Sequence, residues 1–373
     1  MAKSLGREDS QIERARRETS SLEGRGLPSI LTLNHLSRRT GVSYRYLRSI
    51  VGRRHDPYRT FTVSRRNSRK GRPIAVPEPV LMEVQRWLLR RVLHRLSPHR
   101  ASYAYHPGSS IKSCAQEHCG ARWLVKVDLH DFYTNIKEPD VYDVFVAAGY
   151  SPLVSLELAR LCTRDGAFVT HIDRERLQIR NYDDRGVRAY RTGHLGYLPQ
   201  GAPTSGAISN LVAEKLDIGL DSLAQDASLV YTRYADDITL STTEAFTRSN
   251  ALAVVRQVGD ICRLHGFELH RAKTRIVPPG ARHIVLGLLV DDETPRLTRQ
   301  FKSRIATHTY GVERFGLSAH ARSRNFSSLQ GLVNHVNGLI RFALDIEPKW
   351  SVDALAKWRA ALLGGGWPLG QLG

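Results

Sequence analysis

The sequence predicts an α+β fold in which a mixed or antiparallel sheet is backed by helices and followed by a helical C-terminal region. An apolar run that ends at Asp128, and two strand-like runs around Asp236 and Asp237, predict the sheet. Apolar residues that recur every three or four positions between and after these runs predict the helices. At 373 residues, 41% of them hydrophobic, the chain is long enough for two or three subdomains.

The first 57 residues are predicted to form a helical lead. Residues 31–51 carry apolar residues at helical spacing on both sides of Gly41, which predicts two short helices. This arrangement is faintly similar to a helix-turn-helix motif, but small helical pairs are also common structural caps. It therefore does not by itself indicate sequence-specific DNA binding.

The next unit, residues 58–122, begins with a basic hairpin. Residues 59–79 contain two arms rich in strand-forming residues, and a helix is predicted to begin after Pro79. The basic residues of the hairpin tip and second arm are Arg65, Arg66, Arg69, Lys70 and Arg72. A basic hairpin followed by a basic helix favours phosphate binding over a merely solvated surface.

The charge of the whole chain supports a polyanionic partner. The sequence has 55 Lys and Arg against 36 Asp and Glu, and residues 1–100 alone contain 23 basic and 8 acidic residues. This concentration of positive charge predicts nucleic acid as the partner. The alternative is a basic surface that only keeps the protein soluble.

No segment predicts a membrane span or an export signal. The apolar runs are far shorter than the ~20 residues a spanning helix needs, and the N-terminus lacks the apolar core of a signal peptide. We therefore expect a cytoplasmic protein without membrane contact, with its four cysteines reduced. Cys114, His118 and Cys119, with His106 nearby, make a zinc site conceivable, although their spacing matches no common zinc pattern.

The central and C-terminal parts of the chain are predicted to supply the sheet and the remaining helices. The predicted elements are a buried strand at 123–128, a Gly- and Pro-rich loop with a helix at 192–216, a hairpin at 229–241, a helix, a short strand at 267–270, a second hairpin at 283–298 and helices from about 299.

The acidic pair and Asp128 form the constellation that indicates chemistry. A tight turn would let Asp236 and Asp237 clear the sheet edge near Asp128, and carboxylates crowded at such an edge are costly unless divalent cations neutralise them. Hard oxygen ligands select Mg²⁺ or Mn²⁺, and two such ions could activate a 3′-hydroxyl and stabilise leaving pyrophosphate. Aspartate is also a common turn former, but the combination with Asp128 and a basic lobe favours the metal site.

Five segments resemble, in order, the motifs of reverse transcriptases, and most of all those of bacterial retron reverse transcriptases. The segments are VDLHDFYTNI (127–136), LPQGAPTSGAISN (198–210), YTRYADDITLS (231–241), GFELHRAKT (266–274) and HIVLGLLV (283–290). The resemblance extends from residue 27 to about residue 345. It implies a right-hand polymerase with a helical lead at 1–57, fingers at 58–122, a palm at 123–295 that carries a fingers-associated insertion at about 163–193, and a thumb with a C-terminal tail at 296–373.

The resemblance also implies roles for single residues. Asp128, Asp236 and Asp237 would hold two Mg²⁺ ions (or Mn²⁺) with help from the backbone carbonyl of Leu129, and Lys273 would be a general acid. The nucleotide-binding residues would be Lys70, Arg72, the steric gate Tyr133, Gln200 and Gly201. The RNA- or DNA-binding residues would be Arg65, Arg66, Arg69, His118, Gly287, Arg299, Lys302 and Arg304.

The activity implied is the copying of a cognate structured non-coding RNA into DNA from dNTPs. Priming from a guanosine 2′-hydroxyl would give a branched RNA–DNA product (msDNA), with a host RNase H, a separately encoded effector protein and a role in anti-phage defence. Two departures from the family pattern leave the RNA and the subtype open. The stretch 114–118 has Cys114 where the family has Asn, and Leu286 stands where Thr is typical. The alternatives are another defence-associated reverse transcriptase that makes unbranched DNA, a group II intron-like enzyme, or an inert RNA-binding scaffold.

Overall fold

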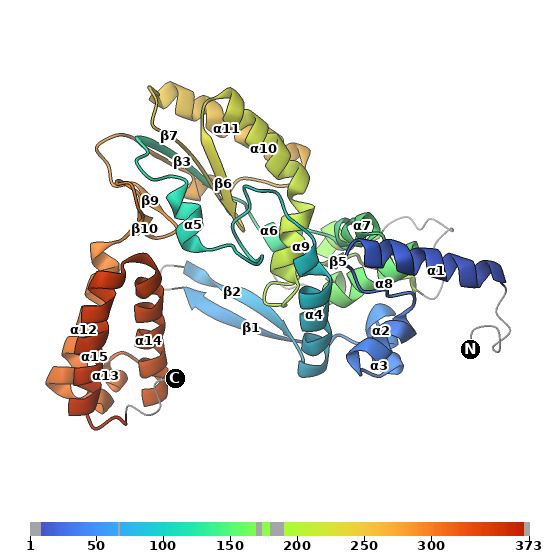
Figure 1. The fold of residues 1–373 in the computed structure, drawn as a ribbon, viewed down its shortest axis with the longest axis horizontal. Helices are drawn as coiled ribbons and strands as arrows, with labels where there is room; N and C mark the ends of the chain where they lie inside the picture. Colours follow the sequence, from blue (N-terminus) through green and yellow to red (C-terminus); the bar gives the residue numbers. More distant parts are fainter. Residues whose placement is uncertain (1–8, 66–67, 169–173, 180–189, 369–373) are drawn as a thin grey trace.

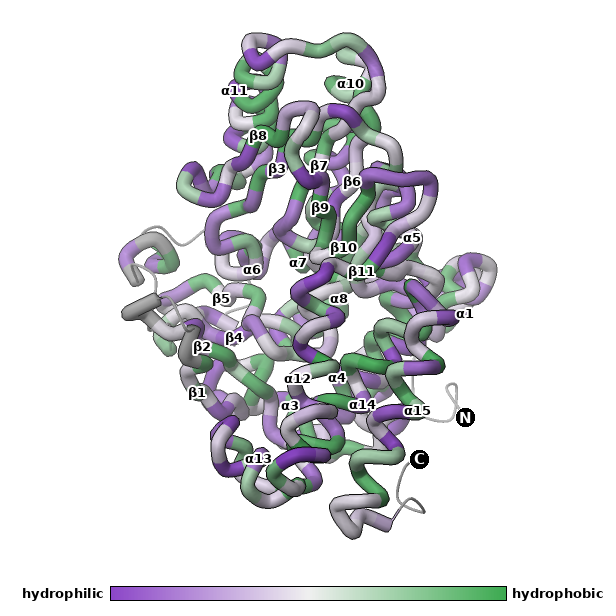
Figure 2. The backbone as a smooth tube through the Cα atoms, turned by 90° about the vertical axis from the view of Figure 1, so that its left-hand side faces the viewer, coloured by the Kyte–Doolittle hydropathy of each residue, from purple (hydrophilic) through white to green (hydrophobic). Residues whose placement is uncertain are grey.

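The computed structural model describes residues 9–65, 68–168, 174–179 and 190–368. Figure 1 shows a helix-covered sheet, a long β-hairpin below it, helices near the N-terminus at one end and a C-terminal helical bundle at the other. In Figure 2, hydrophobic stretches lie on β6 and on helices of the bundle, between hydrophilic loops. Within the described residues no helix is long and apolar enough to cross a membrane.

The main sheet has four antiparallel strands in the order β6-β7-β3-β8. Their bounds are β3 (Trp123–Asp128), β6 (Val230–Tyr234), β7 (Asp237–Thr242) and β8 (Arg275–Val277). Helices α10 (Glu214–Asp226) and α11 (Arg248–Leu264) pack against it. Successive residues of β3 face opposite sides: Val125 and Val127 join the large core, and Leu124 joins the C-terminal core. The strand predicted at 123–128 and the hairpin at 229–241 are confirmed.

The strand predicted at 267–270 is wrong. These residues make one isolated bridge, between Leu269 and Leu129. The buried ring of Phe267 packs against Phe132, with centroids 5.4 Å apart, and the backbone of the segment hydrogen-bonds to Asp128 at the end of β3 and to His130 just after it. The edge strand beside β3 is β8 instead, after the 3₁₀ turn η6 (Arg271–Lys273).

The predicted basic hairpin is confirmed as β1 (Tyr58–Arg65) and β2 (Ser68–Pro77), followed by α4 (Pro79–Arg91). Proline at the first position of α4 suits a helix start, because its missing N–H would have no partner there. The apolar stripe of α4 is buried at Leu81, Val84 and Leu88. Its arginines at 86, 90 and 91 lie on the exposed side.

The N-terminal part consists of α1 (Asp9–Gly24), α2 (Leu33–Thr40) and α3 (Tyr44–Val51). The side chain of Thr32 caps α2, and Gly41 ends it with φ +71°, so the predicted pair of short helices is confirmed. This part packs against α8 (Pro152–Cys162), which itself lies against α7 (Glu138–Ala148). Between them Glu138 is buried and paired with Arg53 and Arg160.

Shorter elements connect these parts. They are η2 (Leu93–Arg95), α5 (Ile111–Gln116), α6 (Phe132–Asn135), β4 (Arg164–Asp165), η3 (Gly166–Phe168), η4 (Arg174–Leu177), β5 (Gly196–Tyr197) and α9 (Ser205–Val212). Strands β4 and β5 pair at the base of the predicted insertion. Its residues 169–173 and 180–189 lie outside the described residues.

The C-terminal part has a core of its own. A small sheet of β9 (Ile284–Val285), β10 (Leu288–Leu289) and β11 (Arg296–Leu297) leads into α12 (Arg299–Phe315), α13 (Leu317–Ser323), α14 (Leu329–Ile346) and α15 (Pro348–Gly364). Residues from these helices and this sheet pack together as the second core. The predicted second hairpin and the helical C-terminal region are therefore confirmed.

Candidate active site

The turn between β6 and β7 presents Asp236 through a left-handed residue. Ala235 has φ +56°, a conformation that costs a non-glycine residue roughly 1 kcal/mol or more. Arg233 Nη1 donates to the Ala235 carbonyl at 3.0 Å, and the Leu129 N–H donates to the Asp236 carbonyl at 2.9 Å. Asp237 already belongs to β7. The prediction that both aspartates occupy the turn is therefore wrong for Asp237.

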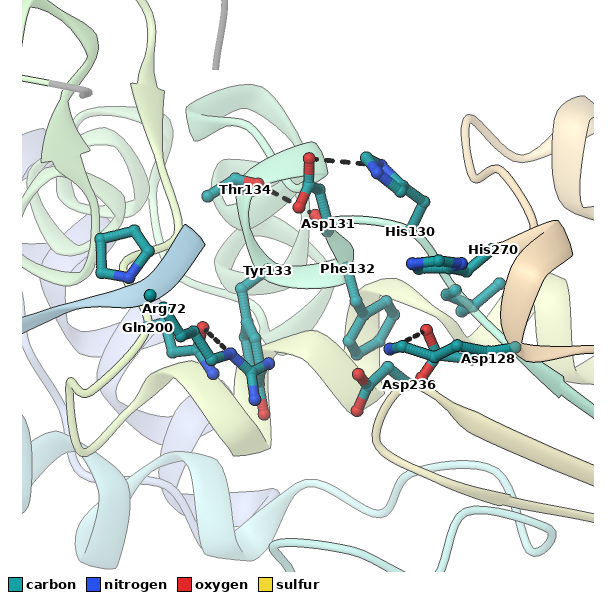
Figure 3. A pocket seen from close by; sticks show the side chains of 14 residues that line it. Arg72, Asp128, His130, Asp131, Phe132, Tyr133, Thr134, Gln200, Asp236 and His270 are labelled. Carbon is teal, nitrogen blue, oxygen red and sulfur yellow. Dashed lines mark hydrogen bonds and ion pairs between the residues drawn. The ribbon is translucent and has the colours of Figure 1, made fainter. Parts of the chain in front are cut away.

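Asp128 and Asp237 lie directly opposite each other on two neighbouring strands. Asp128 is the last residue of β3 and pairs directly with Asp237, the first residue of β7. Directly paired residues of antiparallel strands project on the same face, with Cβ atoms about 5 Å apart. Asp236 comes from the turn just before, and Figure 3 shows it close to Asp128 at one cavity. The predicted convergence of the three aspartates at one end of the sheet is confirmed.

The three carboxylates repel one another. Burial raises the pKa of Asp236, and the negative charge of Asp128 raises it further. Asp237 remains in contact with solvent, yet partial loss of hydration raises the pKa of its carboxyl, followed by the charges of Asp236 and Asp128. A cation placed here would stabilise the charged forms.

Lys273 supplies one such positive charge. Its Nζ lies 2.5 Å from Oδ1 of Asp128. In the described part of the chain, no three His, Cys, Asp or Glu side chains are already arranged as a metal site. The donor chemistry nevertheless fits a divalent cation, because the carboxylate oxygens are hard ligands that repel one another when no cation is present. Binding to Asp128 Oδ1 would require the ammonium group of Lys273 to move.

The cavity beside the aspartates is polar and extends to the basic hairpin. It has a volume of about 370 Å³ and is lined by residues of β2, α6, the loop before α9, the turn and η6. On the side away from the aspartates, Arg72 Nε donates to Gln200 Oε1 at 2.7 Å (Figure 3). The predicted nucleotide-binding residues Arg72, Tyr133 and Gln200 thus line the same cavity as Asp128 and Asp236.

Close packing fixes Tyr133 and the loop at Gly201. Tyr133 in α6 is only 9% exposed, so its ring is fixed by packing against Phe132, whose centroid lies 5.6 Å away. Gly201 has φ +114°, and a Cβ there would lie 2.7 Å from Ile74 Cγ2 of β2. Only glycine lets the loop approach β2 this closely.

The prediction that His118 contacts nucleic acid is not supported by its position. The side chain is 1% exposed, and its two ring nitrogens bond to Ser241 Oγ and Thr232 Oγ1, each at 2.7 Å. Cys114 Sγ contacts the same Thr232 Oγ1 at 3.4 Å. With both nitrogens engaged inside the sheet, His118 is not placed to bind zinc with Cys119 either, and it joins α5 to β6 and β7.

The other predicted nucleic-acid contacts differ in their surroundings. Arg299 and Arg304 are exposed on α12, and Gly287 lies in the β9–β10 turn with φ +86°. Lys302 instead donates to Glu347 Oε2 at 2.5 Å and lies over the ring of Trp350, so its charge is engaged within the bundle. Arg66 and the side chains of Arg65, Arg69 and Lys70 lie outside the described residues.

Sequence reasoning missed three titratable residues of the cavity wall, His130, Asp131 and His270. His130 and Asp131 follow β3 and contact each other, with His130 Nδ1 3.2 Å from Asp131 Oδ2, and the ring of His270 lies 5.6 Å from that of His130 (Figure 3). Asp131 also has φ +46°. Their signal was available, because His130 and Asp131 lie within VDLHDFYTNI and His270 lies within GFELHRAKT.

Known proteins carry the same pattern. Residues 64–287 match the family described as reverse transcriptase (RNA-dependent DNA polymerase). Retron Mx65 reverse transcriptase from Myxococcus xanthus is 31% identical over 340 residues, which cover 90% of this chain and 72% of that protein. The chain belongs to the retron reverse transcriptases.

Two further relatives agree. Retron Ec86 reverse transcriptase from Escherichia coli is 27% identical over 332 residues, or 89% of each chain. Retron Mx162 reverse transcriptase from Myxococcus xanthus is 34% identical over 280 residues, which cover 71% of this chain and 54% of that protein. This retron reverse transcriptase is an RNA-directed DNA polymerase with a right-hand fold, and enzymes of this family act on an RNA template and dNTPs with divalent cations.

Proposed function

We propose that Asp128, Asp236 and Asp237 are the metal ligands of this polymerase and hold two Mg²⁺ ions, for which Mn²⁺ can substitute. The observation that carries the proposal is the direct pairing of Asp128 with Asp237 at the strand ends, with Asp236 in the adjoining turn. The backbone carbonyl of Leu129, beside Asp128, is the proposed further ligand. When bound, the two ions would increase the acidity of the primer hydroxyl and neutralise the departing pyrophosphate.

The protein's own residues would then select and orient the nucleotide. Arg72 has a planar guanidinium suited to phosphate oxygens, and its bond to Gln200 fixes its direction. The ring of Tyr133 would lie beneath the sugar, where it leaves room for hydrogen but not for a 2′-hydroxyl. Gly201 allows the loop to lie against β2 and place Gln200 in the cavity. Lys273 would deliver a proton to pyrophosphate once it is released from Asp128.

We further propose that the template is a structured non-coding RNA and that the product is msDNA, a branched RNA–DNA molecule primed from a guanosine 2′-hydroxyl. The support is the family of this chain, whose relatives are named for their retrons. Phosphate contacts would come from the hairpin with Arg65, Arg66, Arg69 and Lys70, and from Arg299 and Arg304 on the thumb, with Gly287 in the turn before it. Binding of this kind weakens strongly with salt.

The predicted domain boundaries belong to the same proposal, with fingers at 58–122, palm at 123–295 and thumb at 296–373. A cytoplasmic anti-phage role with a separately encoded effector protein and a host RNase H completes it. Its support is again the retron family.

Two experiments test the proposal. The nucleic acid that copurifies with the chain, expressed together with its flanking locus, should contain DNA that a debranching enzyme releases from RNA. Unbranched DNA would point to the alternative defence-associated enzyme. For the site, Asp236→Asn and Asp237→Asn should each abolish DNA synthesis and leave RNA binding nearly unchanged, while Asp353→Asn on the exposed side of α15 changes neither. Synthesis by the Asp236 or Asp237 variant would exclude the proposed ligands.

A further inference from the structure

Arg233 of β6 is a wholly buried arginine directly behind the catalytic turn. Its exposed fraction is 0%, and it lies two residues before Ala235. Arginine is almost never fully buried unless its charge is paired. The contacts of its guanidinium therefore indicate why it is there.

One side of the guanidinium is neutralised by a carboxylate. Arg233 Nε and Nη2 lie 2.7 and 2.6 Å from Oδ1 and Oδ2 of Asp217 in α10, a bidentate pair. Tyr231 donates to the same Asp217 Oδ1 at 2.6 Å. Two parallel hydrogen bonds of this kind fix the plane of the guanidinium and neutralise its charge.

The other side holds the turn. Arg233 Nη1 donates to the Ala235 carbonyl at 3.0 Å and to Asn210 Oδ1 of α9 at 3.1 Å. Ala235 is the left-handed residue that precedes Asp236. The bond to its carbonyl therefore stabilises a strained conformation that sets where the Asp236 side chain begins.

Arg233 also joins this turn to other parts of the site. Its backbone N–H donates to the Ala101 carbonyl at 2.7 Å, and its carbonyl accepts from the Tyr103 N–H at 2.8 Å. Its guanidinium carbon lies 5.7 Å from the ring centroid of Phe132, the neighbour of Tyr133. One side chain thus contacts both the turn with Asp236 and the segment that follows Asp128.

We infer that Arg233 is a positioning residue of the polymerase site, whose fork fixes Asp236 relative to Asp128 and thereby sets the affinity for the divalent cation. The inference rests on the proposed role of Asp236 as a metal ligand. Lysine cannot replace arginine here, because one ammonium cannot pair with both oxygens of Asp217 and also reach the Ala235 carbonyl in a fixed plane.

The test compares Arg233→Lys with a matched control, Arg160→Lys. Arg160 is also buried, pairs with a carboxylate (Glu138, 2.7 Å) and donates to a carbonyl (Val51, 2.9 Å), but these contacts lie away from the turn with Asp236 and from the segment that follows Asp128. The readout is Mn²⁺ binding to the protein without nucleotide, followed by electron paramagnetic resonance, together with kcat and KM for dNTP at varied Mg²⁺. Arg233→Lys should weaken Mn²⁺ binding by about 10-fold or more. It should also lower kcat with little change in KM, while Arg160→Lys keeps the wild-type metal affinity.

Wild-type Mn²⁺ affinity in folded Arg233→Lys, or an equal loss in Arg160→Lys, would overturn the inference. If Arg233→Lys shows no cooperative melting transition, Asn210→Ala decides, because it removes one partner of Nη1 and leaves the pair with Asp217 intact. It should weaken Mn²⁺ binding by about 3-fold, in keeping with a partial loss of support, and an unchanged affinity would refute the inference. Asp236→Asn separates the two proposals: if that variant binds Mn²⁺ like the wild type, the metal assignment itself fails.

Discussion

Lys273 Nζ lies 2.5 Å from Asp128 Oδ1, so a cation of the protein itself contacts the carboxylate that ends β3. The position of Lys273 is fixed by η6, because the His270 N–H donates to the Asp128 carbonyl at 2.7 Å and the Lys273 N–H donates to the His270 carbonyl at 2.9 Å. A divalent cation and the ammonium group would compete for the same oxygen. Competition with the metal would make Lys273 weaken metal binding, whereas donation of a proton would make it increase the rate of synthesis. Substitution of Lys273 separates these two effects.

Lys273→Gln should bind Mn²⁺ more tightly than the wild type and yet turn over more slowly. Removal of the ammonium frees Asp128 Oδ1 for the metal, while loss of a general acid lowers kcat by about 100-fold or more. Titration with Mn²⁺ and single-turnover kinetics measure the two effects. Arg275→Gln, an exposed charge two residues away, is the control for the general loss of positive charge. Weaker metal binding in Lys273→Gln would show that the lysine assists the site rather than competing with the metal.

Asp236→Asn should stabilise the metal-free protein at neutral pH although it abolishes catalysis. The pKa of Asp236 is raised above the ordinary 3.8 by burial and by Asp128, so its ionisation disfavours the folded state. The stability that this group contributes is present below the unfolded pKa and is lost as pH rises through the folded pKa. The gain in Tm from Asn should therefore be absent near pH 3.8 and grow as pH rises. Melting curves with a chelator measure it.

Added Mg²⁺ should make the wild type more stable than Asp236→Asn, because a ligand stabilises only a protein that binds it. The wild-type Tm should rise with Mg²⁺, and that of Asp236→Asn should rise much less. A variant less stable than the wild type at pH 7 in chelator would contradict the mutual repulsion of the aspartates.

The sheet and the carboxylates could be predicted because their signals are local. The strand before Asp128 is rich in apolar residues, with Leu124, Val125 and Val127, and the hairpin has strand-forming residues on both sides of Asp236 and Asp237. The error at residues 267–270 has the opposite cause. Their composition suits a strand, but the packing of Phe267 against Phe132 leaves only Leu269 in register with a neighbour. Tertiary packing determines the conformation of residues 267–270, and the local sequence pattern does not indicate this packing.

The roles of Arg233 and His118 could not be predicted, because their partners are distant in sequence. Asp217 lies on another element from Arg233, and Ser241 is 123 residues from His118. An arginine in a strand of a basic protein suggests a surface position, and only the structure shows it buried. The family resemblance predicts an RNA contact for His118, whereas its bonds to two hydroxyls bury it against strands β6 and β7.

His118→Phe should destabilise the fold without altering RNA affinity. It removes the bonds of His118 to the buried hydroxyls of Thr232 and Ser241, at a cost of about 1–3 kcal/mol for each. Burial, and then the charge of Lys126, lower the pKa of His118 from 6.5 to about 3. Its contribution to stability is therefore present above pH 6.5 and is lost as pH falls toward 3.

The measurement is the difference in unfolding free energy between wild type and His118→Phe from pH 5 to 8, with gel-shift titrations for RNA. The difference should shrink below about pH 6.5, the ordinary histidine value. Other histidines, such as His308, cancel because both proteins contain them. A stable variant with weakened RNA binding would return His118 to the nucleic-acid contacts.

Tyr133→Ala should relax the selection of the sugar. Removing the ring opens space beside the cavity, so the preference for dNTP over the ribonucleotide should fall by about 10- to 100-fold, the range for one small group in a packed pocket. Tyr133→Phe keeps the ring and should keep the preference. Ratios of kcat/KM for matched nucleotides test both variants, and an unchanged ratio in Tyr133→Ala would exclude a steric gate at this position.

Gly201→Ala should impair nucleotide use through geometry alone. A Cβ at this position would lie 2.7 Å from Ile74 Cγ2 and 3.0 Å from the Ala75 carbonyl, so the loop must withdraw from β2. Withdrawal strains the bond from the Ala75 N–H to the Gln200 carbonyl, now 2.8 Å, and moves Gln200 away from Arg72. A shift of about 1 Å in such a clamp can lower kcat/KM for dNTP by about 100-fold.

The control is Gly280→Ala, where φ is +84° but nothing lies within 4 Å of the new Cβ. It should lose roughly 1 kcal/mol of stability and keep wild-type kcat/KM. Equal kinetics in the two variants would show that the loop does not position Arg72.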